Sequence, residues 1–203
     1  PFTVGCRAAR RSQPKQNENA VVFGAGTIGI AAAISLKHFG AEKVMIVDLS
    51  DFRLQKCKQL GFEACNGGKK NLKKSMIDYF GEANSLHGKT ADVDIFIDAA
   101  GADSILNTYQ EIGKFESRLV VVAVNKGLKN IDILDLTYSQ HSIIGSGGYM
   151  PEDVKDVMSI MVSKKYNIES IITHDFSIKD LPKALKQAGK TNESLNVIID
   201  FNK

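Results

Sequence analysis

Three glycines with a fixed spacing are the first residues in this sequence whose pattern points to chemistry. They form a G-x-G-x-x-G turn and are Gly24, Gly26 and Gly29. An apolar run at 20–23 precedes the turn, and a helix-like segment at 27–39 follows it. A turn of this kind between a strand and a helix is the context in which the pattern predicts binding of a dinucleotide.

Each glycine has a separate physical task in such a turn. Gly24 permits the tight turn, Gly26 lets the backbone approach a pyrophosphate, and Gly29 lets the helix close onto the sheet. The start of the helix, at Thr27 and Ile28, offers free N–H groups and a partial positive charge to the phosphates.

A carboxylate follows at the distance that this turn requires. Asp48 ends the second apolar run, 19 residues after Gly29. There it can accept hydrogen bonds from both ribose hydroxyls of an adenosine, and it would repel a 2′-phosphate. Neither Leu49 nor Ser50 could offset that repulsion, so the sequence favours NAD over NADP.

Other catalytic and metal-binding patterns are absent from the sequence. The segment Gly88-Lys89-Thr90 lacks the glycine of a phosphate loop, because Ala83 stands in its place, and a hairpin or loop tip is expected there. No tyrosine has a lysine four residues later, and no G-x-S-x-G nucleophile turn occurs. The four histidines and three cysteines have no metal-ligand spacing, so we expect no metal ligand in this chain.

A basic run of four lysines does not indicate a nucleic-acid partner. No aromatic residue is interleaved among Lys69, Lys70, Lys73 and Lys74, so we interpret them as a solvated helix face.

The elements that must position the turn alternate regularly along the chain. The predicted strands are 20–23, 43–47, 62–65, 93–97, 118–124 and 141–145, and the predicted helices between and after them are 27–39, 51–60, 71–80, 102–112 and 151–164. Runs such as VVF, VMIV and LVVVAV are apolar on both faces, as in parallel strands covered by helices on both sides. We therefore predict an α/β fold with a doubly wound, six-stranded parallel sheet of strand order 3-2-1-4-5-6.

The two ends of the chain differ from this centre. Residues 1–19 are predicted as a basic lead-in helix and loop, 20–168 as the dinucleotide-binding domain, and 169–203 as a return segment with a strand, a helix at 180–189 and a last strand at 195–201.

Composition limits the remaining possibilities. The 203 residues are 43% hydrophobic and 24% charged, which excludes a disordered or collagen-like chain. The net charge of +3 comes from residues 1–19, where four basic residues face one acidic residue. The chain begins with proline rather than methionine, and we expect a fragment or a processed product.

Two further features bear on the compartment. The uncharged stretch 19–36 reaches the length of a short membrane span, but its glycines favour a strand, a turn and a helix, so no membrane partner is expected. Three unpaired cysteines without a disulfide framework indicate a reducing, cytoplasmic location, and Cys57 is expected as a partly exposed helix thiol.

With these residues identified, the chain resembles the C-terminal portion of medium-chain, zinc-type alcohol dehydrogenases, nearest to the sorbitol, butanediol and threonine dehydrogenase branch. The resemblance rests on PFTVGCRAARR at 1–11, VDLSDFRLQKCKQLG at 47–61, DAAG at 98–101, VAV at 122–124 and IITHDF at 171–176.

The resemblance implies further members of the cofactor site. Leu49 and Arg53 would lie beside Asp48 at the adenosine. Ala99, Ala100 and Gly101, together with Val122, Ala123 and Val124, would flank the ribose and nicotinamide; these are strand-end positions.

The resemblance also implies an activity for the full-length protein. It would be a zinc-dependent oxidoreductase that moves a hydride between NAD and a secondary alcohol or polyol, with alcohol or ketone substrates and with zinc ligands outside this chain. A homodimer or homotetramer is implied as well, through pairing at the edge strand 141–145, and the basic helix is expected to have its partners in the missing domain.

Two alternatives remain open at this point. One is a zinc-free reductase of the same superfamily, similar to quinone reductases. The other is a nucleotide-sensing domain without catalysis, which would lack the IITHDF segment and the basic lead-in helix. A methyltransferase is disfavoured because Gly29 and the helix start would have no role in it.

Overall fold

The computed structural model describes residues 1–125 and 127–203. Its centre is a six-stranded sheet in the order β3-β2-β1-β6-β7-β8, in which every neighbouring pair is parallel. The strands are β1 (Ala20–Phe23), β2 (Val44–Asp48), β3 (Glu63–Asn66), β6 (Ile95–Asp98), β7 (Arg118–Val121) and β8 (Ser142–Gly145). Because two further strands of a hairpin intervene in the numbering, this is the predicted 3-2-1-4-5-6 order, and the fold prediction is confirmed.

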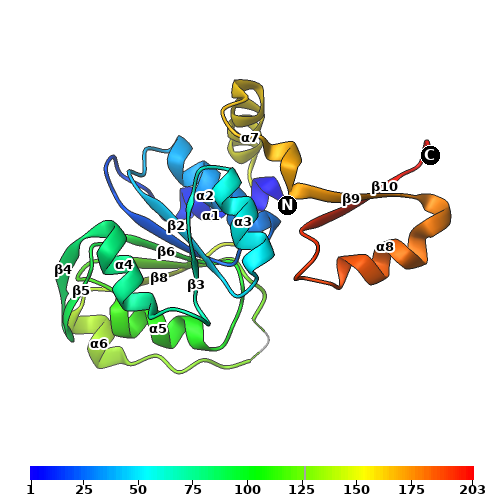
Figure 1. The fold of residues 1–203 in the computed structure, drawn as a ribbon. Helices are drawn as coiled ribbons and strands as arrows, with labels where there is room; N and C mark the ends of the chain where they lie inside the picture. The colour runs from blue at the N-terminus through cyan, green and yellow to red at the C-terminus, as the bar shows by residue number, and fades with distance from the viewer. Residues whose placement is uncertain (126) are drawn as a thin grey trace.

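Helices cover both faces of this sheet (Figure 1). One face packs α1 (Phe2–Arg11), α2 (Thr27–His38), α3 (Asp51–Gln59) and α7 (Pro151–Ser163); the other packs α4 (Leu72–Phe80) and α5 (Ser104–Ile112). Successive residues of a strand point to opposite faces, so Val22 joins the first core and Val21 the second. Burial on both faces explains why the strands read as continuous apolar runs.

One predicted strand ends earlier than predicted, an expected hairpin is present, and one helix is additional. The strand predicted at 118–124 ends at Val121, so residues 122–124 form a loop after it. The hairpin expected around Gly88 is present, as β4 (Glu82–Ser85) paired antiparallel with β5 (Gly88–Ala91). A short helix, α6 (Ile133–Tyr138), precedes β8 and was not predicted.

The basic helix α1 finds its partners inside this chain, which corrects the expectation that they lie in a missing domain. Arg10 Nε donates to the buried carboxylate of Asp153 at 2.7 Å and also pairs with Asp156, both on α7. Arg11 Nε donates to the Gly145 carbonyl oxygen at 3.2 Å. Acidic residues of α7 therefore compensate part of the positive charge of α1.

Cys57 was expected to be partly exposed, and that expectation is wrong. Its side chain is fully buried on the inner face of α3, within the core beneath α2 and α3. Burial first, and then the charge of Asp48, raises the pKa of the Cys57 thiol to about 12. Lys56 and Lys58, on either side of Cys57 in the sequence, therefore do not make it a thiolate.

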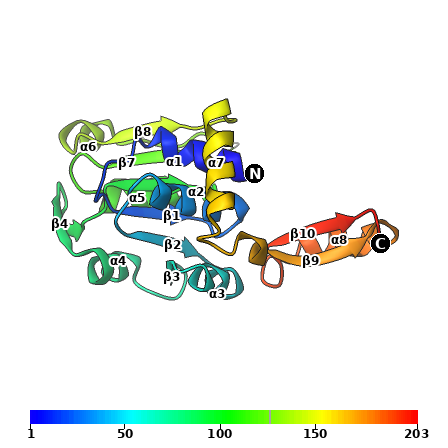
Figure 2. The same cartoon turned by 90° about the horizontal axis from the view of Figure 1, so that it is seen from above.

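The last part of the chain forms a separate small unit. It consists of β9 (Ile172–Ser177), α8 (Leu181–Ala188) and β10 (Asn196–Asp200), with β9 and β10 paired in parallel. Figure 2 shows this unit projecting from the side toward which the sheet strands point. We call it the tail unit.

Among the described residues, no helix combines the length and apolar character that crossing a membrane requires.

Candidate functional site

The glycine turn lies between β1 and α2, and two of its glycines are required by the fold. Gly24 has φ +105°, in the left-handed region that favours glycine. A Cβ on Gly29 would stand 1.8 Å from the carbonyl oxygen of Gly24, so no side chain fits there. Both residues shape the turn itself.

Gly26 differs from these two glycines because the fold alone does not require it. Its backbone is extended, with φ −78° and ψ 177°, and a Cβ on it would meet no atom within 4 Å. It is the N-cap of α2, and no side chain caps the N–H groups of this helix. The turn therefore leaves open space in front of a helix N-terminus, where Thr27 and Ile28 begin the helix and an anion would be stabilised.

Asp48 is attached directly to this turn. Its Oδ2 accepts a hydrogen bond from the N–H of Ala25 at 2.7 Å, and its Oδ1 accepts one from the N–H of Ser50 at 2.8 Å. An ionised carboxylate has about four lone-pair positions, so two backbone bonds leave acceptor capacity for sugar hydroxyls. The half-buried carboxylate thus lies beside the open space at Gly26.

The ends of β6 and β7 meet next to the turn. The buried Asp98 accepts hydrogen bonds at Oδ1 from the N–H groups of Ala100 at 3.1 Å and Gly101 at 2.7 Å. Its carbonyl oxygen accepts from both Val122 and Ala123, each at 3.0 Å. Asp98 therefore holds the loops after the two strands together.

These loops carry the remaining site residues that the sequence predicted. The N–H of Ala99 donates to Phe23 O at 2.9 Å, which joins the loop after β6 to the end of β1. Gly101 has φ +73°, and a Cβ on it would stand 3.2 Å from the Cβ of Ala123. The side chain of Val124 is 87% exposed.

A cavity of about 460 Å³ lies at this edge of the sheet and gathers five of the predicted site residues. These are Gly24, Asp48, Leu49, Arg53 and Ala100. Sequence reasoning missed other members of its wall, including Leu72 of α4, Ile105 and Thr108 of α5, and Thr191 and Asn192 of the tail unit. The α5 residues follow from the position of the helix after β6, but nothing in the sequence indicates Thr191 or Asn192.

Arg53 points toward the tail unit as well as the cavity. Its Nε donates to the carbonyl oxygen of Ser194 at 3.4 Å. Arg53 and Asp48 both line the cavity, and the contact of Arg53 with the tail unit was not predicted.

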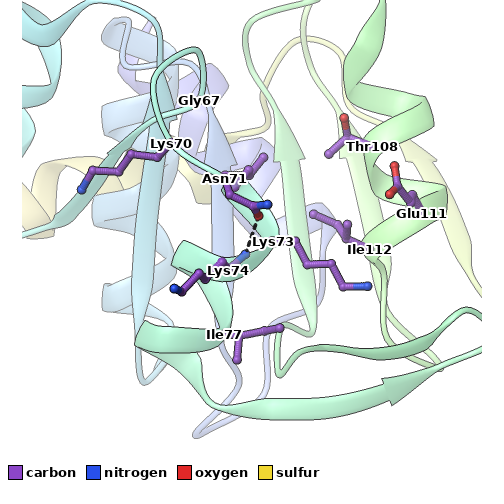
Figure 3. A pocket seen from close by; sticks show the side chains of 10 residues that line it. Gly67, Lys70, Asn71, Lys73, Lys74, Ile77, Thr108, Glu111 and Ile112 are labelled. Carbon is purple, nitrogen blue, oxygen red and sulfur yellow. Dashed lines mark hydrogen bonds between the residues drawn. The ribbon is translucent and has the colours of Figure 1, made fainter.

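A second groove, of about 610 Å³, adjoins the cavity and shares Gly67, Leu72 and Thr108 with it. Lys73 of α4 extends toward the α5 side of this groove, below Ile112, whereas Lys70 and Lys74 point to the opposite side (Figure 3). The groove contains no part of the glycine turn and no aspartate, so the larger volume is not the better candidate for the site.

No metal centre is found in the described part of the chain. No group of three or more histidine, cysteine, aspartate or glutamate side chains there could hold a metal ion. The cysteines Cys6, Cys57 and Cys65 are all buried in the core. These residues do not fit a zinc site.

Comparison with known proteins relates this geometry to a family. The family described as zinc-binding dehydrogenase matches residues 27–163. Sorbitol dehydrogenase 1 of Saccharomyces cerevisiae is 28% identical over 185 residues, which are 91% of this chain and 51% of that protein. L-threonine 3-dehydrogenase of Escherichia fergusonii is 28% identical over 186 residues, which are 91% of this chain and 52% of that protein. The chain therefore spans about half the length of the curated relatives it matches.

Solved structures show the same fold. The 2R,3R-butanediol dehydrogenase of Bacillus subtilis superposes with a TM-score of 0.84 at 22% identity, over 98% of this chain and 55% of that one. A structure from E. coli CFT073, described as a short chain alcohol dehydrogenase complexed with cofactor NADH, gives 0.85 at 24% identity, over 99% and 57%.

Proposed function

The chain belongs to the zinc-binding dehydrogenase family, and on that premise we propose that it is the NAD-binding part of a longer oxidoreductase. The full-length enzyme would transfer a hydride between NAD and a secondary alcohol or polyol, and its substrates would be small alcohols or ketones. The hydrogen bond between Asp48 and the N–H of Ala25 carries this proposal, because it joins the ribose-binding carboxylate to the phosphate-binding turn.

The residues of the turn fit the phosphates of a dinucleotide. The space in front of Gly26 and the uncapped start of α2 would hold the pyrophosphate, with Thr27 and Ile28 supplying backbone N–H groups. Gly24 and Gly29 keep this turn in shape.

The residues around the cavity fit the rest of the cofactor. Asp48 would accept hydrogen bonds from the ribose hydroxyls, and Leu49 and Arg53 would border the adenosine. Residues 99–101 and 122–124 would flank the nicotinamide end, which when bound accepts or donates the hydride. Support also comes from a relative by fold that was solved with NADH.

The proposal places the zinc of the full-length enzyme outside this chain. We propose no catalytic residue and no metal ligand among these residues, in keeping with the lack of a suitable group in the part that the structure describes. Metal analysis of the full-length protein distinguishes the zinc enzyme from a zinc-free reductase. Zinc at one atom per subunit or more supports the first, and its absence from active protein supports the second.

We further propose that residues 1–19 and 169–203 flank a dinucleotide-binding domain at 20–168, that the protein is cytoplasmic, and that it forms a homodimer or homotetramer. Strand β8 lies at the end of the sheet, and the adjacent α6 exposes the apolar side chains of Ile133, Leu134 and Tyr138. An edge strand beside exposed apolar side chains favours pairing with a second copy.

Calorimetric titration of this chain with NADH tests the binding function. The informative variant is Gly26→Ala, because the backbone at Gly26 and the free space around it accommodate alanine. We expect this variant to keep its unfolding midpoint and to bind NADH at least tenfold more weakly, since the methyl group would occupy the phosphate position.

Gly145→Ala is the matched control, because a Cβ on this β8 residue also meets no atom within 4 Å. It should bind NADH as the unmodified chain does. An unmodified chain that does not bind NADH, or a Gly26→Ala variant that binds it equally well, would refute the proposed site.

A further inference from the structure

A turn of the tail unit forms one wall of the cavity beside Asp48. Residues 189–194 connect α8 to β10, and Thr191 and Asn192 within this turn line the cavity. The turn meets the start of α3 at a sequence separation of 141 residues.

The contacts that attach this turn use two hydrogen-bond donors next to Asp48. The hydroxyl of Ser50 donates to the carbonyl oxygen of Thr191 at 3.2 Å. Nε of Arg53 donates to the carbonyl oxygen of Ser194 at 3.4 Å. Both donors belong to the N-cap and first turn of α3, directly after the strand that ends in Asp48.

These two donors have the chemistry of a phosphate site. A guanidinium and a hydroxyl beside the ribose-binding position are the groups that accommodate a 2′-phosphate in NADP enzymes. Here the carbonyl oxygens of the turn accept from the Ser50 hydroxyl and from Nε of Arg53, which holds the Arg53 side chain against the turn, and Thr191 and Asn192 border the same space. The carboxylate of Asp48 is therefore not the only feature that disfavours a 2′-phosphate.

We propose that the turn at residues 189–194 determines cofactor choice together with Asp48. Its carbonyl oxygens accept hydrogen bonds from Ser50 and Arg53, so that these two side chains do not bind the 2′-phosphate of NADP. This inference rests on the proposed function, because it requires the cavity to bind the adenosine half of the cofactor. It assigns Arg53 as a positioning residue that fixes the turn, rather than as a group that binds phosphate.

Ser194 provides a way to loosen the turn without touching the cavity wall. Its hydroxyl is buried and donates to the carbonyl oxygens of Gln187 at 2.8 Å and Lys190 at 2.9 Å. Ser194→Ala removes both bonds. Ser177 is the matched control, since its hydroxyl donates to the carbonyl oxygen of Lys203 at 2.8 Å, elsewhere in the tail unit.

The experiment measures dissociation constants of NADH and NADPH by fluorescence for five forms of the chain. They are the unmodified chain, Asp48→Ala, Asp48→Ala/Ser194→Ala, Asp48→Ala/Ser177→Ala and Asp48→Ala/Arg53→Ala. We expect Asp48→Ala to bring the dissociation constants of NADH and NADPH closer together. Adding Ser194→Ala should strengthen NADPH binding by about a further tenfold, as one charged hydrogen bond to phosphate would, while adding Ser177→Ala should change nothing.

The Arg53 variant keeps the test decisive even if Ser194→Ala does not fold. If the turn holds Arg53, then adding Arg53→Ala to Asp48→Ala changes the dissociation constants of NADH and NADPH by the same factor; a loss of about tenfold in NADPH binding alone would show that Arg53 binds the phosphate and would overturn the inference. An unchanged cofactor ratio in Asp48→Ala/Ser194→Ala would also overturn it. An unmodified chain that binds neither cofactor would contradict the proposed function itself, and this inference with it.

Discussion

At the scale of single residues, the three glycines of the turn have separable roles. Gly24 and Gly29 are required by the backbone, through a positive φ and a contact of 1.8 Å that a Cβ would make. Gly26 is required only if something occupies the space before it. Asp48 and Asp98 also differ in role, because Asp48 lines the cavity whereas Asp98 is buried and holds two loops together. Sequence spacing identifies such residues, but it does not distinguish a residue that maintains the fold from one that would contact a ligand.

Cys57 leads to a prediction about pH. Burial first, then the charge of Asp48, raises the pKa of its thiol from 9.0 to about 12 in the folded chain. The folded state therefore keeps a proton that the unfolded state releases above pH 9. This contribution to stability is complete below pH 9 and is lost between pH 9 and about 12, by about 1 kcal/mol at pH 10.

Urea unfolding at pH 8 and pH 10 checks this prediction. The unmodified chain should lose more stability between these pH values than Cys57→Ala, which has no thiol to titrate. Equal losses in the two proteins would mean that the buried thiol does not contribute.

At the scale of elements, the strands in the middle of the sheet were predictable because both of their faces are buried. Runs such as 20–23 and 44–48 contain few polar residues, so their type is clear from the sequence. The end of β7 could not be predicted, because Val122–Val124 continue the apolar run after the strand has ended. Helix α6 was missed because six residues with three exposed apolar side chains have no clear periodicity.

The pairing of α1 with α7 also escaped prediction, because it joins residues 143 positions apart. Asp153 is fully buried, accepts from Arg10 Nε at 2.7 Å, and accepts from the N–H of Met150 at 2.7 Å at the start of α7. We predict that Asp153→Asn lowers the free energy of unfolding by about 2 to 3 kcal/mol, since it removes a buried charge that an arginine requires.

Urea unfolding at neutral pH measures this loss. Glu152→Gln, an exposed change in the same helical turn, should alter stability by no more than about 0.5 kcal/mol. If both variants unfold at the same urea concentration, the ion pair does not hold α1 to α7.

At the scale of the whole molecule, the tail unit gives the structure its most informative long-range contact. The sequence suggested that residues 169–203 belong outside the sheet, and the tail unit does project from it (Figure 1). Thr191 and Asn192 of its turn at 189–194 nevertheless line the cavity beside Asp48. Such a contact depends on how two units pack, through backbone carbonyl oxygens that every residue has, so no residue type could reveal it.

The proposed oligomer gives a prediction at the same scale. Ile133 and Leu134 of α6 are 64% and 66% exposed, next to the edge strand β8. Light scattering should detect at least a dimer for the unmodified chain, and a monomer for Ile133→Glu/Leu134→Glu, because charges on an apolar contact disfavour association. A monomeric unmodified chain would contradict this prediction.

The central claim is that NADH binds at the carboxyl edge of the sheet, and hydrogen exchange with and without NADH tests it most directly. The account predicts slower exchange of the amides at 24–29, 48–53, 99–101, 122–124 and 189–194. Slower exchange confined to the groove between α4 and α5, or no change at the glycine turn, would contradict it.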